Sequence, residues 1–279
     1  MQLSQIQAQL DLIDRESTIR KCTDPSSMPD RKQVIELIKD LQALLFPGYF
    51  LSRSVREEGL SGLSLLEKIR EEVTSLLENV SLFRGEELVA QRLCDAFLER
   101  LPHIKSLLLK DVEALYLGDP AAKSREEVLL CYPGFYAISI YRLAHEFYTL
   151  KVPLLPRIMT EYAHEKTGVD IHAGAQIGEY FFIDHGTGIV VGETCVIGHH
   201  VKLYQGVTLG AKSFELDENG NPVKELKRHP NIGNHVIIYA NATILGGDTY
   251  VGDGCVIGAS VWLVKSVEAG KTLYYSPNH

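Results

Sequence analysis

The chain has 279 residues, and its 28 Lys and Arg against 36 Asp and Glu give a formal net charge of −8 at pH 7. This acidic balance lacks the basic surface that attracts a phosphate backbone, so we exclude nucleic acid as a partner. No run of about 18 apolar residues occurs, and residues 1–17 are mixed in charge. We therefore expect no contact with a membrane, no secretory signal and a cytoplasmic protein. The five scattered cysteines lack a C-x-x-C pair, which favours reduced thiols.

Residues 1–165 carry the apolar spacing of amphipathic helices and are predicted to form an all-α helical domain. One helix is expected between Asp30 and Pro47, and a second along the stripe from Leu65 to Val80. A third should run from residue 88 to Pro102 and end there, because proline disrupts a helix interior. Further helices are expected over 103–118 and 135–148, separated by a turn at 118–120.

Residues 166–265 show a different pattern, an aliphatic side chain every six positions. The recurrent residues are Ile171, Ile177, Ile183 and Ile189, then in a shifted frame Val191, Ile197, Leu203 and Leu209, and later Ile232, Ile238, Ile244, Val251, Ile257 and Leu263. A coil of three short strands explains this period, because each strand sends one aliphatic side chain into a shared axis. The pattern predicts a parallel β-helix of roughly four coils, with Cys195 and Cys255 as core residues.

Residues 211–228 interrupt the six-residue period and contain the dense turn signal DENGNP at 217–222. We expect them to form a loop that protrudes from the solenoid, and such loops are commonly functional. Residues 266–279 are expected to form a short carboxyl-terminal tail.

His185 has the surroundings best suited to chemistry. It lies in the segment DHGTG at 184–188, whose glycines permit close approach of a ligand. Asp170 precedes it by 15 residues, about one coil away, so a hydrogen bond between the two side chains is feasible. A carboxylate on one imidazole nitrogen would make the other a general base. Asp170 could instead be only a turn residue that opens the first strand, and His199 and His200 are interpreted as solvated.

Several segments together closely resemble the serine O-acetyltransferases, a family of hexapeptide-repeat acyltransferases. They are GDPAA at 118–122, VDIHAGAQIG at 169–178, IDHGTGIVVGETCVIG at 183–198, VTLGA at 207–211, KRHPNIG at 227–233 and ATILGG at 242–247. The resemblance implies a left-handed parallel β-helix that assembles as a homotrimer or a dimer of trimers. It also implies transfer of acetyl from acetyl-CoA to the hydroxyl of L-serine, the first step of cysteine biosynthesis from serine, with no metal.

The resemblance assigns roles to individual residues. His185 corresponds to the general base and Asp170 to its orienting partner, while Asp119 and Asp184 correspond to the acidic residues that bind serine. Arg228 corresponds to the arginine that receives the serine carboxylate and His229 to a second catalytic histidine, both supplied by the neighbouring subunit. The residues that match positions lining the pantetheine channel are Gly210, Ala240 and Ala259, although the surrounding YANA and GASV differ from the family's usual G-A-G-A and G-A-G-S.

The residue types agree with this chemistry. A zwitterionic amino acid needs a carboxylate for its ammonium group and a guanidinium for its carboxylate. Because no cysteine or serine stands in these motifs as a nucleophile, direct attack on the thioester is expected. Alternatives are a hexapeptide acyltransferase for another acceptor (homoserine or an aminosugar), a solenoid carbonic anhydrase, and a non-catalytic trimeric scaffold. The short tail lacks a terminal isoleucine, so no stable complex with O-acetylserine sulfhydrylase is expected.

Overall fold

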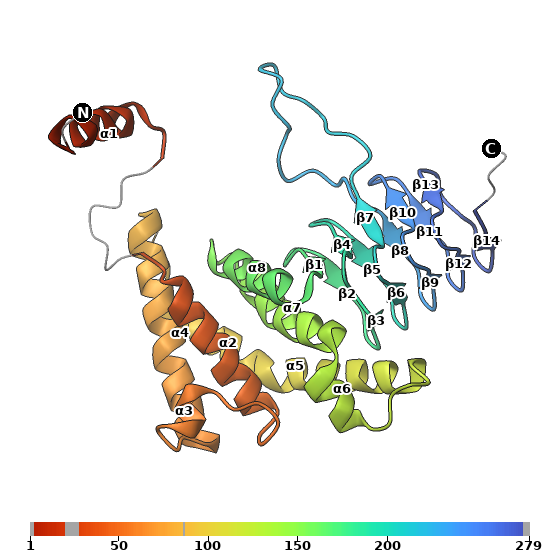
Figure 1. Ribbon diagram of the computed structural model, residues 1–279, viewed down its shortest axis with the longest axis horizontal. Helices are drawn as coiled ribbons and strands as arrows, with labels where there is room; N and C mark the ends of the chain where they lie inside the picture. The colour runs from red at the N-terminus through yellow and green to blue at the C-terminus, as the bar shows by residue number, and fades with distance from the viewer. Residues whose placement is uncertain (1–2, 20–27, 86, 276–279) are drawn as a thin grey trace.

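The computed structural model describes residues 3–19, 28–85 and 87–275, and in it helices precede a β-solenoid (Figure 1). The helices are α1 (Leu3–Glu16), α2 (Arg31–Leu45), α3 (Arg53–Arg56), α4 (Gly62–Arg84), α5 (Ala90–Gly118), α6 (Arg125–Cys131), α7 (Pro133–Thr149) and α8 (Leu155–Thr167). The expected helices between Asp30 and Pro47, along 65–80 and over 135–148 are therefore confirmed. Within the described ranges no helix is long and apolar enough to cross a membrane.

The predicted end of the third helix at Pro102 is wrong. Helix α5 continues through Pro102 to Gly118, so the two helices expected over 88–101 and 103–118 form one helix. Proline removes one hydrogen bond and costs a helix interior about 3 kcal/mol. Burial of the apolar stripe on both sides of the proline offsets this cost, since Phe97, Leu101, Ile104 and Leu108 are at most 6% exposed.

The solenoid has three faces of parallel strands. Face one contains β1 (Asp170–Ile171), β4 (Val190–Val191), β7 (Thr208–Gly210), β10 (Thr243–Leu245) and β13 (Trp262–Leu263). Face two contains β2 (Gln176–Ile177), β5 (Val196–Ile197), β8 (Asn231–Ile232) and β11 (Tyr250–Val251). Face three contains β3 (Phe182–Asp184), β6 (Lys202–Tyr204), β9 (Ile237–Ile238), β12 (Val256–Ile257) and β14 (Thr272–Leu273).

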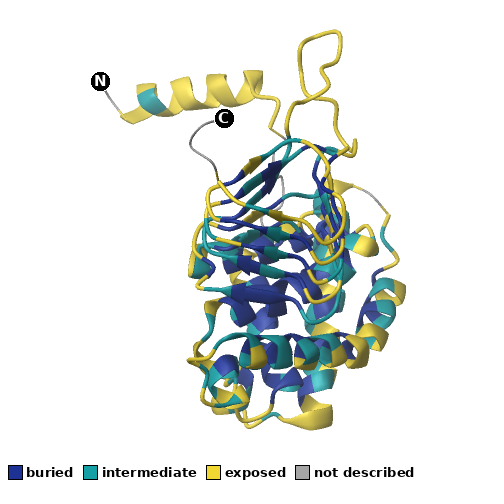
Figure 2. Cartoon of the chain, turned by 90° about the vertical axis from the view of Figure 1, so that its right-hand side faces the viewer, coloured by how far each residue is buried: buried dark blue, intermediate teal, exposed yellow. Residues whose placement is uncertain are grey.

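This is the expected left-handed parallel β-helix, with about five turns rather than the predicted four. The predicted aliphatic residues fill its axis, and much of the solenoid backbone belongs to buried residues (Figure 2). Cys195 and Cys255 lie among them with no exposed surface. The chain crosses from face three to face one at what we call the 3–1 corner, and from face one to face two at the 1–2 corner.

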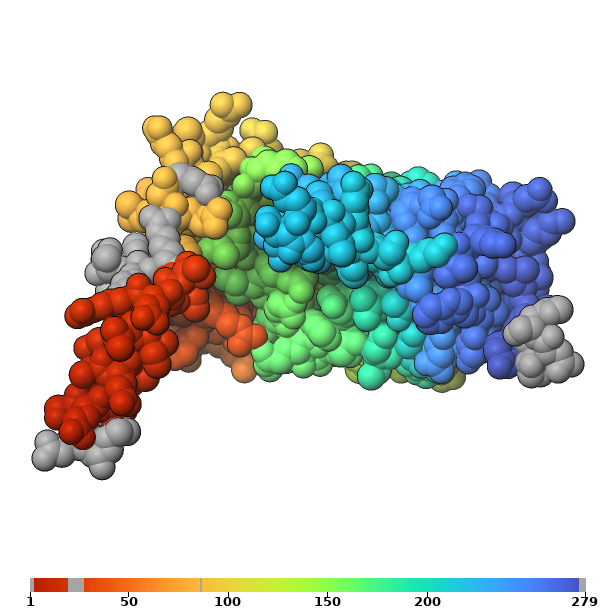
Figure 3. Space-filling model, turned by 90° about the horizontal axis from the view of Figure 1, so that it is seen from above, coloured from red at the N-terminus to blue at the C-terminus, as the bar shows by residue number. Residues whose placement is uncertain are grey.

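The loop over 211–228 leaves the solenoid at the 1–2 corner, between β7 and β8, and projects away from it (Figure 1). Its turn is the predicted one, because the Asp217 carboxylate accepts hydrogen bonds from the backbone N–H groups of Asn219 and Asn221, both at 2.9 Å. Seen from above, the side to which it projects, the loop lies in front of other parts of the chain (Figure 3). Its side chains Phe214 and Leu216 are more than half exposed.

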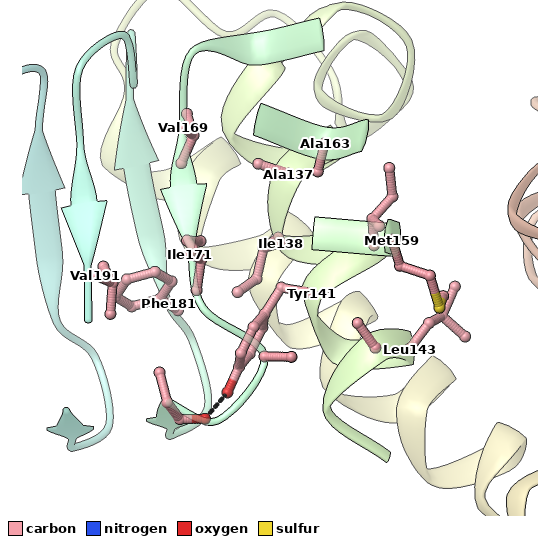
Figure 4. Close-up of a cluster of buried hydrophobic side chains, with 14 of the residues drawn as sticks. Ala137, Ile138, Tyr141, Leu143, Met159, Ala163, Val169, Ile171, Phe181 and Val191 are labelled. Carbon is pink, nitrogen blue, oxygen red and sulfur yellow. Dashed lines mark hydrogen bonds between the residues drawn. The ribbon is translucent and has the colours of Figure 1, made fainter. Parts of the chain in front are cut away.

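The helices close one end of the solenoid through a buried polar link as well as apolar contacts. Arg142 of α7 binds Asp111 of α5 by two hydrogen bonds of 2.5 and 2.9 Å, and its guanidinium also donates to the carbonyl of Gly178 at 2.8 Å. Asp111 in turn accepts from the backbone N–H of Phe181 at 2.9 Å. Tyr141 donates to the carbonyl of Ala175 from within the apolar cluster between α7, α8 and the first coil (Figure 4).

We expect Arg142→Met to lower the free energy of unfolding by about 3–5 kcal/mol, because Asp111 would remain buried without its counter-charge. Urea unfolding followed by circular dichroism measures the change. The double variant Arg142→Met/Asp111→Leu should recover part of the loss, since it removes both charges. A single variant as stable as the wild type would contradict this role of the ion pair.

Candidate active site

The first coil has an enlarged 3–1 corner that carries His185. The inward-facing Ile183 and Val191 are eight positions apart, whereas Leu203 and Leu209, one coil later, are six apart. The two additional residues explain the shift of frame in the sequence. Gly186 and Gly188 turn the chain with φ angles of 83° and 80°, and His185 itself has φ 56°. Its side chain is 71% exposed and points away from the aliphatic interior.

Two carboxylates stand beside this imidazole. Asp184 places Oδ1 3.6 Å from His185 Nδ1. Asp119, at the end of α5, reaches the same corner because Gly118 packs against the ring of Phe182. The pKa of Asp119 is held below its ordinary value by a hydrogen bond from the Tyr132 hydroxyl, by a second from the backbone N–H of Ala121, and by the nearby imidazole of His185. Asp119 is therefore ionised at neutral pH.

Asp170 lies at the same corner, one coil away from His185. The backbone N–H of Asp170 donates to the carbonyl of Ile189, at the end of the His185 turn, at 2.9 Å. The structure describes both side chains and records neither a hydrogen bond nor an ion pair between Asp170 and His185. Asp170 instead has a carboxylate oxygen within 4.8 Å of ligand atoms of Glu161 and His164 on α8. Its expected contact with His185 stays a prediction.

The 1–2 corner of the second coil holds a separate group of polar side chains around Arg228. The Arg228 guanidinium donates to Oε2 of Glu193 at 2.5 Å, and the Tyr148 hydroxyl donates to Oε1 of the same carboxylate at 3.0 Å. A cavity of about 240 Å³ beside them is lined by Tyr148, Glu193 and His172. Two residues of this group were not predicted from the sequence: Glu193, which lies in the motif GETC, and Tyr148, which no motif contains.

The imidazole of His229 is held in one tautomer at this corner. Its Nδ1 accepts a hydrogen bond from the backbone N–H of Thr194 at 3.1 Å, so the ring proton is on Nε2. The residue is only 7% exposed, and its ring lies on Gly192, where an added Cβ would stand 2.2 Å from Nε2. Burial, together with the positive charges of Arg228 and Lys227, lowers the pKa of His229 to about 4. His229 is thus a neutral imidazole whose ring N–H is on Nε2.

The predicted site residues therefore fall into two groups on one chain. His185, Asp184, Asp119 and Asp170 gather at the 3–1 corner, and Ala240 and Ala259 follow at the same corner of later coils. Arg228, His229 and Gly210 belong to the 1–2 corner. The fold does not bring the two groups together within one subunit.

No family model matches the chain, but individual proteins do. It is 48% identical to "Serine acetyltransferase, plasmid" of Synechococcus elongatus over 259 residues, which are 87% of this chain and 80% of that protein. It is 41% identical to a serine acetyltransferase of Bacillus subtilis over 171 residues, 61% of this chain and 74% of that protein.

Solved structures give the same result. Serine acetyltransferase 1 of Entamoeba histolytica in complex with L-cysteine has a TM-score of 0.76 and 38% identity, with 86% of each chain covered. The fold and its histidine-bearing corner define a hexapeptide-repeat acyltransferase. The chain belongs to the serine acetyltransferase family.

Protonation of His229 should weaken the folded state in acid. The unfolded chain takes up this proton near pH 6.5 and the folded chain only near 4, so the free energy of unfolding should fall as the pH drops through this window. In His229→Gln, urea unfolding measured between these pH values should lose part of that slope. An unchanged slope in the variant would contradict the neutral, buried state of His229.

Proposed function

We propose that this chain is a serine O-acetyltransferase, which transfers acetyl from acetyl-CoA to the hydroxyl of L-serine and releases O-acetyl-L-serine and CoA. The observation that carries the proposal is the exposed imidazole of His185 beside the carboxylate of Asp184 and near that of Asp119, on a chain of this family. The product is the precursor from which cysteine is made. The reaction needs no metal, and the enzyme is expected in the cytoplasm.

His185 acts as the general base. Its imidazole removes the serine hydroxyl proton as the oxygen attacks the thioester carbonyl of acetyl-CoA, so that a C–O bond forms. Collapse of the tetrahedral intermediate breaks the C–S bond, and the imidazolium returns the proton to the CoA sulfur. Asp170 orients His185 and stabilises its protonated form, a role supported by their shared corner on adjacent coils.

The charged residues hold serine by its two ends. Asp119 is ionised and suits the serine ammonium group, and Asp184 adds a second carboxylate at the same corner. Arg228 suits the serine carboxylate, because a guanidinium binds a carboxylate with two parallel hydrogen bonds. Neutral His229 has its N–H on Nε2, and this donor is suited to the oxyanion that develops on the thioester oxygen. Among acceptors, this pairing favours an α-amino acid over an aminosugar.

The site is completed between subunits of a homotrimer, alone or paired as a dimer of trimers. The base and its carboxylates occupy one corner of the solenoid, and the arginine and second histidine occupy another. In a cyclic trimer, each 3–1 corner can face the 1–2 corner of the next subunit. The pantetheine arm of acetyl-CoA then runs along Ala240 and Ala259 on one wall and Gly210 on the other. The absence of a stable complex with O-acetylserine sulfhydrylase stays a prediction, and residues 276–279 lie outside the described part of the chain.

Replacement of His185 by alanine should lower kcat for serine acetylation by about 10²- to 10⁴-fold, because the hydroxyl proton loses its acceptor. The KM for acetyl-CoA should change little. CoA release measured with L-serine, L-homoserine and glucosamine tests the base and the acceptor together.

His200→Ala is the matched control for this variant. His200 is also exposed and also adopts a left-handed backbone conformation, with φ 58°, but it lies at the corner between faces two and three. Its replacement should leave kcat unchanged. Wild-type turnover by His185→Ala would refute the assignment of the base, and a purified wild-type protein inert toward serine would refute the function.

A further inference from the structure

Tyr132 is the direct partner of Asp119 at the 3–1 corner. Its hydroxyl donates to Oδ2 of Asp119 at 2.5 Å, while the backbone N–H of Ala121 donates to Oδ1 at 2.8 Å. Each carboxylate oxygen thus accepts one hydrogen bond from the protein and keeps further lone pairs for a ligand. The Tyr132 contact comes from a different helix, so it ties the turn after α5 to the start of α7.

The backbone next to Tyr132 packs against strand β3, which leads into the candidate site. Tyr132 ends α6, where its N–H donates to the carbonyl of Val128 at 3.2 Å, and it precedes Pro133, the first residue of α7. Gly134 then packs on β3, where an added Cβ would lie 2.4 Å from the carbonyl oxygen of Ile183. Strand β3 ends at Asp184, beside His185. The hydroxyl of Tyr132 is therefore held relative to the same strand that presents the base.

We propose that Tyr132 is a positioning residue for serine binding: its hydroxyl orients the Asp119 carboxylate toward the substrate ammonium group. The proposal rests on the proposed function. Because this hydrogen bond and that from the backbone N–H of Ala121 hold the two carboxylate oxygens, loss of the hydroxyl leaves Asp119 free to turn away from the substrate ammonium group. The charged groups that face the pair are His185, Asp184, Lys123 and Glu127.

The variant Tyr132→Phe keeps the ring and removes only the hydroxyl. We expect the KM for serine to rise about tenfold, the loss typical of one hydrogen bond to a charged group, with the KM for acetyl-CoA and the kcat nearly unchanged. A purely structural role of the hydroxyl would instead lower kcat, or change the KM for both substrates.

Tyr136→Phe is the matched control. Tyr136 lies in the first turn of α7, just after Tyr132, and its hydroxyl contacts that of Tyr162 at 3.4 Å rather than Asp119, so its loss should leave the KM for serine unchanged. In an Asp119→Asn background, Tyr132→Phe should have no further effect on the KM for serine, because the oriented charge is already absent.

The proposal is overturned if Tyr132→Phe binds serine like the wild type, or if its effect is undiminished in the Asp119→Asn background. Either result on an enzyme that acetylates serine leaves the proposed function intact. Failure of the wild-type protein to acetylate serine would instead overturn the function itself, so the two failures are distinguishable.

Discussion

The close packing of two helices against strand β3 is the constraint on which the candidate site depends. Gly118 at the end of α5 lies against the ring of Phe182, and Gly134 at the start of α7 lies against the carbonyl of Ile183. In both places an added Cβ would come within 2.6 Å of β3 atoms. Only glycine permits this approach. As a result, Asp119 and its hydrogen-bond partner Tyr132 reach the corner at which β3 delivers Asp184 and His185.

The chemistry is concentrated where the solenoid departs from its regular repeat. A regular coil satisfies its backbone in strand ladders and its side chains in the axis, so it leaves little free for a ligand. The enlarged 3–1 corner exposes His185, and the long insertion at the 1–2 corner returns through Arg228 and His229. The buried contact between Arg142 and Asp111 keeps the first coil attached to the helices, so that these irregular segments stand on a rigid base.

The six-residue aliphatic recurrence was sufficient to predict the solenoid, because one inward side chain per strand is a strict spatial requirement. The helix end at Pro102 was wrong because the local preference of proline was outweighed by burial on both sides of it, which depends on tertiary contacts. The motifs predicted both groups of polar site residues. They did not identify Tyr132 or Tyr148, since a hydroxyl that contacts a carboxylate 13 or 45 residues away leaves no local pattern.

The central claim is that a complete site takes His185 from one subunit and His229 from the next. Subunit mixing tests it directly: the inactive variants His185→Ala and His229→Ala are unfolded together, refolded at equal amounts and assayed for CoA release. In a cyclic trimer assembled at random from equal amounts, about a quarter of the sites combine an intact His185 from one subunit with an intact His229 from the next. About a quarter of the wild-type activity should therefore return. Mixed oligomers, verified by native mass spectrometry, that remain inactive would contradict a site shared between subunits.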